Sequence, residues 1–209
     1  MKVNNLKSDG KPKPEEVEPI KSKKDIERIK QYLLGKDSKR DYLMFVMGIN
    51  IGLRAGDLLS LRFEDVMDNG KIKDSITLIE EKTSKSRKSV QRRDLELNDS
   101  IKKAIKLYTG SLEAEPNMND YLFSSRKGNE AISVGSAHKI IKQTMRDLKI
   151  KGNYGSHSLR KSFGFHLYNA GVPIETIQKT FQHSTQAMTL KYIGITKEVI
   201  RNVYHLLNL

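Results

Sequence analysis

The sequence predicts a mainly α-helical domain of the α+β class, with a small antiparallel β-sheet inserted near its first third. Apolar residues recur at helical spacing over most of the chain, whereas two segments of strand-like composition flank a strongly basic stretch. The chain has 209 residues, of which 37% are hydrophobic. That length and composition suit one packed core with small attachments.

The expected elements are separated by changes of periodicity and by turn residues. In chain order they are a flexible arm at 1–21, helices at 23–34, 38–51 and around 58–61, strands at 76–79 and 90–97, a helix at 98–108, a short strand at 121–123, and helices at 136–148, 158–170, 173–181, 186–192 and 196–207. The arm is assigned from three prolines among charged and polar residues.

Capping residues mark several helix ends. Ser22 is placed to cap the first helix, with Asp25 three residues later, where a capping box has Glu or Gln. Gly52 and Gly171 follow the last periodic residues of two helices, as C-terminal glycines do. Pro173 suits the first position of a helix, because a proline has no N–H to leave unpaired.

The composition excludes several classes of protein and site. The chain has no cysteine, so disulfides, thiolate nucleophiles and cysteine-ligated metals are excluded. The longest apolar stretch, 42–49, is far shorter than the roughly 20 residues of a membrane-spanning helix. The first residues lack the apolar segment of a signal peptide. We therefore expect a cytoplasmic protein with no membrane attachment.

The net charge indicates a polyanionic partner. The 38 lysines and arginines outnumber the 25 acidic residues, which gives a formal charge of +13. Phosphates attract such an excess, and the release of counterions favours the contact. Nucleic acid is the expected partner, although ribosome-associated and membrane-surface proteins are also basic.

Two clusters in the first half carry positive charge at defined places. Arg54 lies in 52–61, just after a glycine that ends a helix and just before an apolar helix. The segment 82–93 then holds six basic residues and no acidic one, namely Lys82, Lys85, Arg87, Lys88, Arg92 and Arg93. A turn this basic repels itself unless an anion lies against it. Taken singly, each residue is also explained as an exposed arginine or part of a solvated turn.

Two clusters in the second half add histidines, an arginine and a tyrosine. His157 and Arg160 are three residues apart, so they share one face at a helix start, where free N–H groups and the helix dipole favour an anion. His183 and Tyr192 follow in 181–195. By itself, a tyrosine among apolar residues is usually a core residue.

Together the four clusters resemble the tyrosine recombinases, or phage integrase family. Members carry an arginine in a Gly-Leu-Arg loop, a lysine on a β-hairpin, a His-x-x-Arg helix, and a late histidine followed by the nucleophilic tyrosine. This sequence has them in that order, at Arg54, Lys82, His157, Arg160, His183 and Tyr192. The spacings of 26 residues between the histidines and nine from the second histidine to the tyrosine also match. The resemblance covers 22–195 and implies the catalytic domain and fold of the small stand-alone members.

The chemistry of phosphodiester cleavage fits these residue types. Negative charge spreads over the nonbridging oxygens in the transition state, and an arginine is always charged and donates two parallel hydrogen bonds. Arg54 and Arg160 could do much of what a metal ion does elsewhere, so we expect no metal and no cofactor. The pKa of a tyrosine is ordinarily about 10, and we expect nearby cations to lower the pKa of Tyr192.

The resemblance implies a role for the remaining residues and a class of reaction. Tyr192 would join the 3′ phosphate of DNA and free a 5′ hydroxyl. Lys82 would protonate that oxygen, His157 would assist with the tyrosine proton, and His183 would bind the phosphate. The implied function is site-specific recombination of duplex DNA (integration, excision or inversion) in a bacterium or its phage, near the nucleoid. A non-catalytic DNA-binding regulator and a type IB-like topoisomerase are alternatives, and RNA or ribosome binding would explain the charge alone.

Further basic residues are candidates for DNA contacts. They are Lys85, Arg87 and Lys88 on the basic turn, and Lys139, Lys142 and Arg146 on the helix at 136–148. By resemblance, we also expect self-association as a dimer or tetramer on DNA. Accessory proteins that bend DNA or set the direction of recombination are a further expectation.

The sequence departs from the family pattern in two places. Asp57 stands where the family often has Glu, which alters how Arg54 would be supported. About twenty residues precede the catalytic region, where most integrases carry a separate DNA-binding domain, so we do not expect tight autonomous recognition of the site. At 196–209, an apolar stripe predicts a helix that packs on its own domain or, as often in the family, in a neighbouring subunit. We favour exchange, because Gly194 offers a hinge beside the nucleophile.

Overall fold

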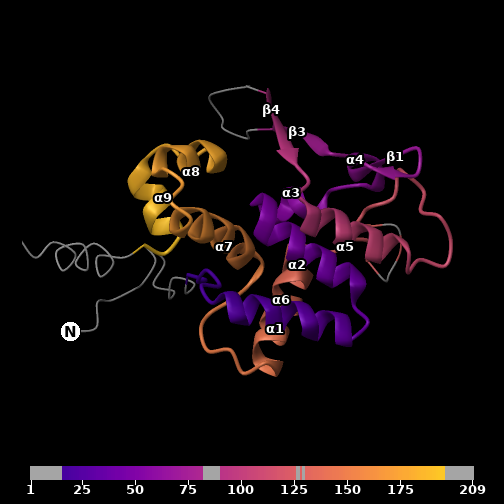
Figure 1. Ribbon diagram of the computed structural model, residues 1–209, viewed down its shortest axis with the longest axis horizontal. Coiled ribbons are helices and arrows are strands. Elements are labelled where there is room, and N and C mark those ends of the chain that lie inside the picture. Colours follow the sequence, from indigo (N-terminus) through magenta and orange to yellow (C-terminus); the bar gives the residue numbers. More distant parts are fainter. Residues whose placement is uncertain (1–15, 82–89, 126–127, 129, 196–209) are drawn as a thin grey trace, which may run out of the picture.

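The computed structural model describes residues 16–81, 90–125, 128 and 130–195 (Figure 1). Its elements in chain order are α1 (Lys23–Gly35), α2 (Lys39–Ile51), α3 (Ala55–Leu59), α4 (Phe63–Val66), β1 (Met67–Asp68), β2 (Lys71–Ile72), β3 (Ser75–Glu81), β4 (Val90–Glu96), α5 (Asp99–Thr109), α6 (Val134–Asp147), α7 (Ser156–Asn169), α8 (Ile174–Phe181) and α9 (Gln186–Tyr192). Within those ranges, no helix has the length and apolar character needed to cross a membrane. The predicted class, mainly helical with a small antiparallel sheet, is confirmed.

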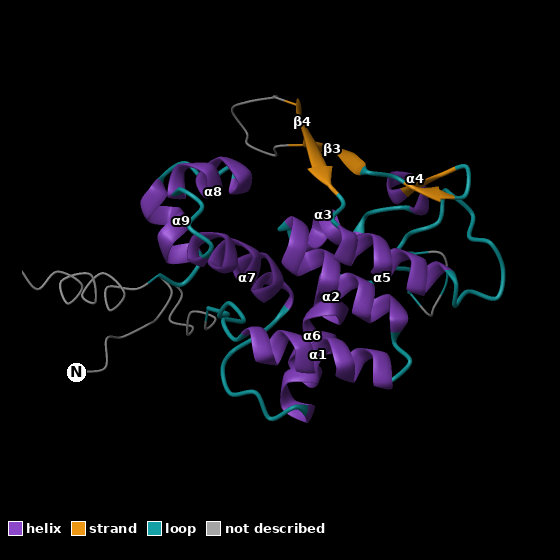
Figure 2. Ribbon diagram, in the orientation of Figure 1, coloured by secondary structure: helices purple, strands orange, loops and turns teal. Residues whose placement is uncertain are grey.

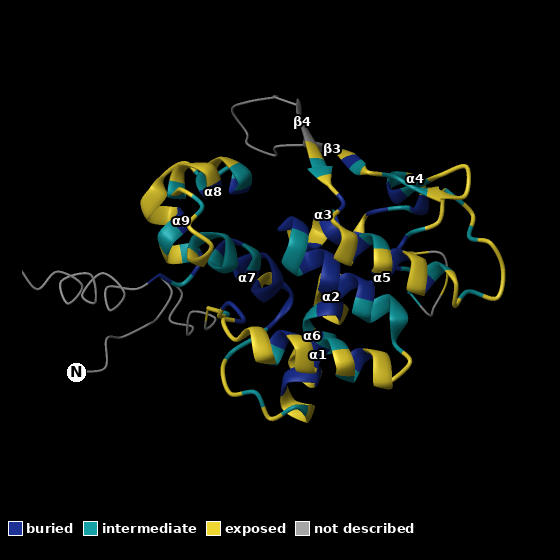
Figure 3. Cartoon of the chain, in the orientation of Figure 1, coloured by how far each residue is buried: buried dark blue, intermediate teal, exposed yellow. Residues whose placement is uncertain are grey.

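The central helix is α2, which packs against α1, α5 and α7. Its residues from Leu43 to Gly48 are all buried, and Figure 3 shows this stretch in the middle of the molecule. A Cβ atom on Gly48 would lie 2.6 Å from the Leu159 side chain, so the glycine lets α2 and α7 approach closely. The apolar run of α2 therefore forms the main core, and α7 packs closely against it because Gly48 has no side chain.

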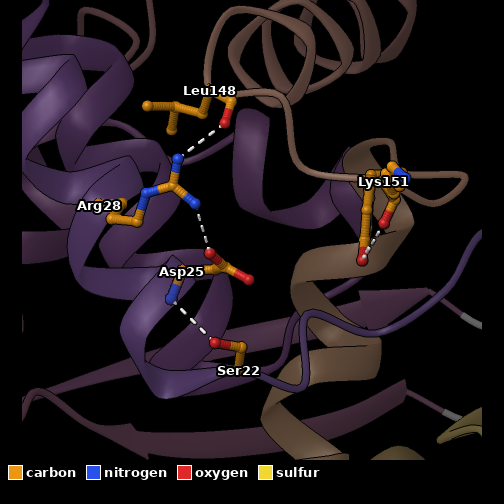
Figure 4. A network of polar contacts seen from close by, with 6 residues as sticks. Ser22, Asp25, Arg28, Leu148 and Lys151 are labelled. Atoms are coloured by element: carbon orange, nitrogen blue, oxygen red, sulfur yellow. Dashed lines mark hydrogen bonds and ion pairs between the residues drawn. The ribbon is translucent and has the colours of Figure 1, made fainter.

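The start of α1 is fixed by a chain of polar contacts (Figure 4). The Ser22 hydroxyl accepts a hydrogen bond from the Asp25 N–H, which confirms Ser22 as the N-cap. The Asp25 carboxylate accepts from Arg28, and Arg28 also donates to the Leu148 carbonyl at the end of α6. This arrangement satisfies a free N–H of the first turn and joins α1 to α6.

The expected hairpin is confirmed, and Figure 2 shows it projecting from the helical body. Strands β3 and β4 are antiparallel, with a register from Ser75↔Glu96 to Glu81↔Val90. A second hairpin, β1–β2, was not predicted. Its turn holds Asn69 and Gly70 at φ values of 48° and 74°, and Asn-Gly is a strong sequence signal for such a turn. The signal was therefore present in the sequence.

The strand expected at 121–123 was wrong. The segment makes only an isolated bridge between Arg62 and Tyr121, although Leu122 and Phe123 are fully buried. An apolar run of three residues is too short to distinguish a strand from a buried turn. Two helices also begin two residues earlier than expected: α6 at Val134 and α7 at Ser156.

A second, smaller core lies on the side of α7 that faces away from the main core. Ile177, Phe181, Ile193 and Ile195 form it, and Figure 1 shows α8 and α9 grouped there beside α7. A Cβ atom on Gly164 would lie 2.5 Å from the Phe181 ring and 2.7 Å from Ile193. Helix α7 therefore separates the two cores and is in contact with both.

The segment 16–21 differs from the flexible arm expected there. Ile20 is 1% exposed. Its N–H donates to the Ser162 hydroxyl over 2.7 Å, and its carbonyl pairs with the His166 ring over 2.9 Å. These residues therefore pack along α7, because Ile20 is an apolar side chain that the core can bury. The predicted segments 1–15 and 196–209 lie outside the described residues.

We expect Gly52→Ala to lower the free energy of unfolding by roughly 2–4 kcal/mol. Gly52 has φ of 61°, and a methyl group there would lie 2.2 Å from the Phe163 ring, so backbone strain adds to a clash. Urea unfolding measures the change. The matched control is Gly35→Ala, where φ is not positive and nothing lies within 4 Å. Its change should stay within about 1 kcal/mol, and equal losses in the two variants would contradict the prediction.

Candidate active site

Arg54 is placed by the turn that ends α2. Gly52 adopts the left-handed conformation, the buried Leu53 anchors the turn, and Arg54 becomes the N-cap of α3. Its side chain is 47% exposed and lies 3.9 Å from the Asp57 carboxylate. The aspartate therefore supports Arg54 from within α3 while leaving its guanidinium accessible to solvent.

Arg160, in the second turn of α7, is buried at 3% exposure. Its guanidinium donates to the carbonyl of Gly52 and, over 2.9 Å, to the carbonyl of Phe181. The guanidinium carbon also lies 4.4 Å from the centroid of the Phe181 ring. A buried charge requires such partners, so Arg160 links the turn after α2 to the end of α8.

His157 lies in the first turn of α7, because that helix begins at Ser156. Partial desolvation lowers the pKa of its imidazole, and the positive charges of Lys161 and Arg160 act in the same direction. His138 of α6 contributes a smaller effect on that pKa. The neutral form, which accepts a proton, is therefore favoured.

His183 follows the left-handed residue Gln182 at the end of α8. Its Nδ1 lies 3.0 Å from the hydroxyl oxygen of the fully buried Thr189. Desolvation lowers the pKa of His183, with further lowering by the charges of Arg160 and Arg54. The ring is thus oriented by α9 and neutral beside two guanidinium groups.

Tyr192 is the last residue of α9 and lies among aromatic rings. Its ring centroid is 5.1 Å from that of His183 and 5.6 Å from that of Phe181, both edge-on. Burial raises the pKa of its phenol, while the charge and hydrogen bonding of Arg160 and the charge of Arg54 oppose that effect. The expectation of a lowered pKa is wrong for the free protein, because desolvation outweighs the cations.

The structure brings five of the six predicted catalytic residues into one cluster, namely Arg54, His157, Arg160, His183 and Tyr192. Lys82 and its neighbours Lys85, Arg87 and Lys88 lie outside the described residues, between the ends of β3 and β4. The described part of the chain holds no group of three or more histidine or acidic residues arranged to bind a metal ion. The cluster can bind an anion beside a phenol and two neutral imidazoles.

The basic residues expected on the helix at 136–148 lie on the exposed face of α6. Lys139, Lys142 and Arg146 line a groove of about 800 Å³ together with Tyr32 of α1 and Lys36, the residue that follows α1. On the same helix, His138 is close enough to His157 to lower its pKa, so the N-terminal half of α6 borders the site.

Sequence reasoning missed two side chains that contact Tyr192 or its neighbours. Lys161 is 4% exposed, and its Nζ lies 5.0 Å from the centroid of the Tyr192 ring. Thr189 supports His183. A lysine directly after Arg160 was visible in the sequence, but nothing local distinguishes a buried lysine from a solvated one.

Comparison with known proteins agrees with this arrangement. Residues 21–198 match the model of the family described as the phage integrase family. A probable integrase/recombinase, YoeC of Bacillus subtilis (strain 168), is 36% identical over 188 residues, which are 90% of this chain and 95% of YoeC. Tyrosine recombinase XerA of Pyrococcus furiosus is 27% identical over 180 residues. The match covers 85% of this chain and 58% of XerA, so the chain spans little more than half of that relative.

Solved structures have the same fold. The Tn1549 transposon integrase, in complex with circular intermediate DNA, superposes with a TM-score of 0.67 at 16% identity, over 94% of this chain and 69% of that chain. An identity this low shows the fold alone. The overall fold of this chain is therefore shared with that integrase.

We expect the Tyr192 phenol to ionise above the ordinary pKa of about 10, because burial raises its pKa. The difference in tyrosinate absorbance between the native protein and Tyr192→Phe, followed against pH, isolates this group. A pKa raised on folding stabilises the protein at pH values below the unfolded pKa, and that contribution is lost as the pH rises through the folded pKa. The native protein should therefore lose stability relative to Tyr192→Phe as the pH rises above about 10. A component ionising below pH of about 10 would contradict the prediction.

Proposed function

This chain belongs to the phage integrase family, and on that premise we propose that it cuts and rejoins duplex DNA at specific sites through a covalent bond to Tyr192. The observation that carries the proposal is the cluster around Tyr192, in which Arg54, Arg160 and His183 influence or contact its ring. Two arginines and a phenol in one site suit phosphoryl transfer to tyrosine. The relatives are recombinases, so a non-catalytic regulator and a topoisomerase are not favoured.

The proposed first step is an in-line displacement at phosphorus. The Tyr192 oxygen forms a bond to the phosphorus atom, the bond from phosphorus to the 5′ oxygen breaks, and that oxygen leaves with the electron pair. Negative charge on the nonbridging oxygens is stabilised by Arg54, which is solvent-accessible, and by Arg160. The 3′-phosphotyrosine stores the bond energy, so attack by another 5′ hydroxyl rejoins the strand.

Two proton transfers accompany the proposed displacement. In the free protein, Tyr192 is protonated, because burial raises its pKa, so its proton must leave as it attacks. Neutral His157, whose pKa is lowered, is the proposed acceptor. By resemblance to the family, Lys82 supplies the proton to the leaving 5′ oxygen, and His183 binds the phosphate.

The proposed DNA surface includes the basic hairpin turn and the exposed face of α6. Lys139, Lys142 and Arg146 lie on that face and line its groove, and the Tn1549 integrase, which shares the fold, is described in complex with DNA. By family resemblance, two or four copies assemble on DNA, with accessory proteins that bend it or set direction, in the nucleoid of a bacterial cell. Within the chain, we assign 22–195 to catalysis and 196–209 to docking in a neighbouring copy.

We expect Tyr192→Phe to abolish formation of the covalent adduct, while DNA affinity changes by no more than about threefold, because the phenolic oxygen is the nucleophile and not the main phosphate ligand. A nicked suicide substrate loses the short fragment that carries the freed 5′ hydroxyl, so the strand cannot be rejoined and the adduct accumulates. A denaturing gel then detects the adduct. The control is Tyr204→Phe, which should still react. An adduct in the Tyr192 variant, mapped to Tyr204 or elsewhere, would show that the assignment is wrong.

We expect DNA affinity to fall steeply with salt, and Lys139→Gln with Lys142→Gln to reduce the slope of log K against log salt by about 2, since each phosphate contact contributes about 0.9. Fluorescence anisotropy over a salt series measures the slope. The matched control is Lys103→Gln with Lys106→Gln, two exposed lysines at the same spacing on α5. Equal slopes in the native protein and the α6 double variant would place the DNA surface elsewhere.

A further inference from the structure

A buried lysine lies against the ring of the nucleophilic tyrosine. Lys161, on α7 directly after Arg160, is 4% exposed. Its Nζ lies 5.0 Å from the centroid of the Tyr192 ring. A cation over an aromatic face is attracted by the ring, and more strongly when both are shielded from water. The phosphate chemistry described above uses Arg54 and Arg160 and gives Lys161 no part.

The ammonium of Lys161 is paired with Glu16. The distance from Nζ to the Glu16 carboxylate oxygen is 2.7 Å, and the two side chains are 5% and 59% exposed. Glu16 reaches this place because the segment 16–20 is hydrogen-bonded to the rest of the domain. The Glu18 N–H donates to the Asn153 carbonyl over 2.8 Å, and both backbone polar groups of Ile20 are held by α7.

The same segment also contacts the residues that follow the nucleophile. A Cβ atom on Gly194 would lie 3.2 Å from the Pro19 ring, so Pro19 lies against the backbone just beyond α9. The segment 16–20 therefore makes two contacts near Tyr192. Glu16 contacts Lys161, whose ammonium lies over the Tyr192 ring, and Pro19 contacts the turn that follows Tyr192. We call this segment the strap.

An ion pair with an exposed carboxylate contributes little net stability, since water screens the attraction while the buried ammonium of Lys161 must still be desolvated. The charge of Lys161 therefore adds little to the free energy of folding. Its position over the Tyr192 ring indicates a role in the site instead. We propose that Lys161 is a positioning residue for the nucleophile: held by Glu16 of the strap, it fixes the Tyr192 ring so that the phenolic oxygen meets the phosphate. This inference rests on the function proposed above.

The test compares the rate of cleavage with DNA affinity in matched variants. Lys161→Met keeps the length of the side chain and removes its charge, and Lys161→Arg restores a cation. The control is Lys21→Met, because Lys21 lies 5.7 Å from the Phe165 ring in a similar pair beside α7 but outside the site. The readouts are the dissociation constant for the nicked suicide substrate and the single-turnover rate of adduct formation at saturating DNA.

We expect Lys161→Met to slow adduct formation roughly tenfold while its dissociation constant stays within about twofold of native, because a misplaced ring affects the reaction and not the binding. Lys161→Arg should recover most of the rate, and Lys21→Met should react as the native protein does. A folded Lys161→Met protein that reacts at the native rate, or one whose rate loss the arginine does not recover, would overturn the proposal.

The strap supplies a second variant that leaves the buried lysine in place. Glu16→Gln removes the exposed partner's charge, and Glu18→Gln, two residues away and also exposed, is its control. We expect a loss of roughly threefold in rate for Glu16→Gln alone. If Lys161→Met does not fold, Glu16→Gln and its control Glu18→Gln test the proposal in its place. Equal rates of adduct formation in these two variants would overturn it.

Two outcomes separate this inference from the proposed function. A native adduct at Tyr192 with no effect of the Lys161 or Glu16 variants overturns the positioning role and leaves the recombinase function standing. Failure of the native protein to form any adduct counts against the function itself. In that case the ring is observed directly, by fluorine NMR of protein containing 3-fluorotyrosine. A Tyr192 resonance with the same position and width in native, Lys161→Arg and Glu16→Gln proteins overturns the proposal, and changes confined to Glu16→Gln support it.

Discussion

The site depends on the buried guanidinium of Arg160, whose donors fix two distant backbone segments at once. It donates to the carbonyl of Gly52, where the chain leaves α2, and to the carbonyl of Phe181, at the end of α8. A buried charge is tolerated only when it is hydrogen-bonded, and those carbonyls in turn would lose a partner without it. The turn that carries Arg54 and the turn that carries His183 are therefore held in one geometry.

The charge of Arg160 also contributes to the pKa values of its neighbours, after the larger effect of desolvation. With desolvation as the larger cause, it lowers the pKa values of His157 and His183. It opposes the rise that burial causes in the pKa of Tyr192, but does not reverse it. The free protein therefore holds neutral imidazoles and a neutral phenol beside fixed positive charge. For the phosphate chemistry proposed above, such a site would need little reorganisation, and its neutral imidazoles can accept protons.

The sequence by itself determined the family, the mainly helical class and most of the elements. The signals for these are local: a side-chain cap at Ser22, a left-handed glycine at Gly52, and apolar residues at helical spacing each act within a few residues. The bounds expected for α9, 186–192, agree with the structure. The missed β1–β2 hairpin was equally local, since its Asn-Gly turn is in the sequence. The chain order of Arg54 to Tyr192 identified the residues, whose individual roles stay predictions.

Only the tertiary structure decided how those residues are solvated and what they touch. The burial of Arg160, the raised pKa of Tyr192 and the position of Lys161 each depend on atoms from segments far apart in the chain. The strap is the clearest case, because the sequence at 16–20 has the composition of a free arm, yet Ser162 and His166 hold its backbone. Desolvation and long-range hydrogen bonds belong to the packed arrangement and leave no periodic signal, so no local pattern could predict them.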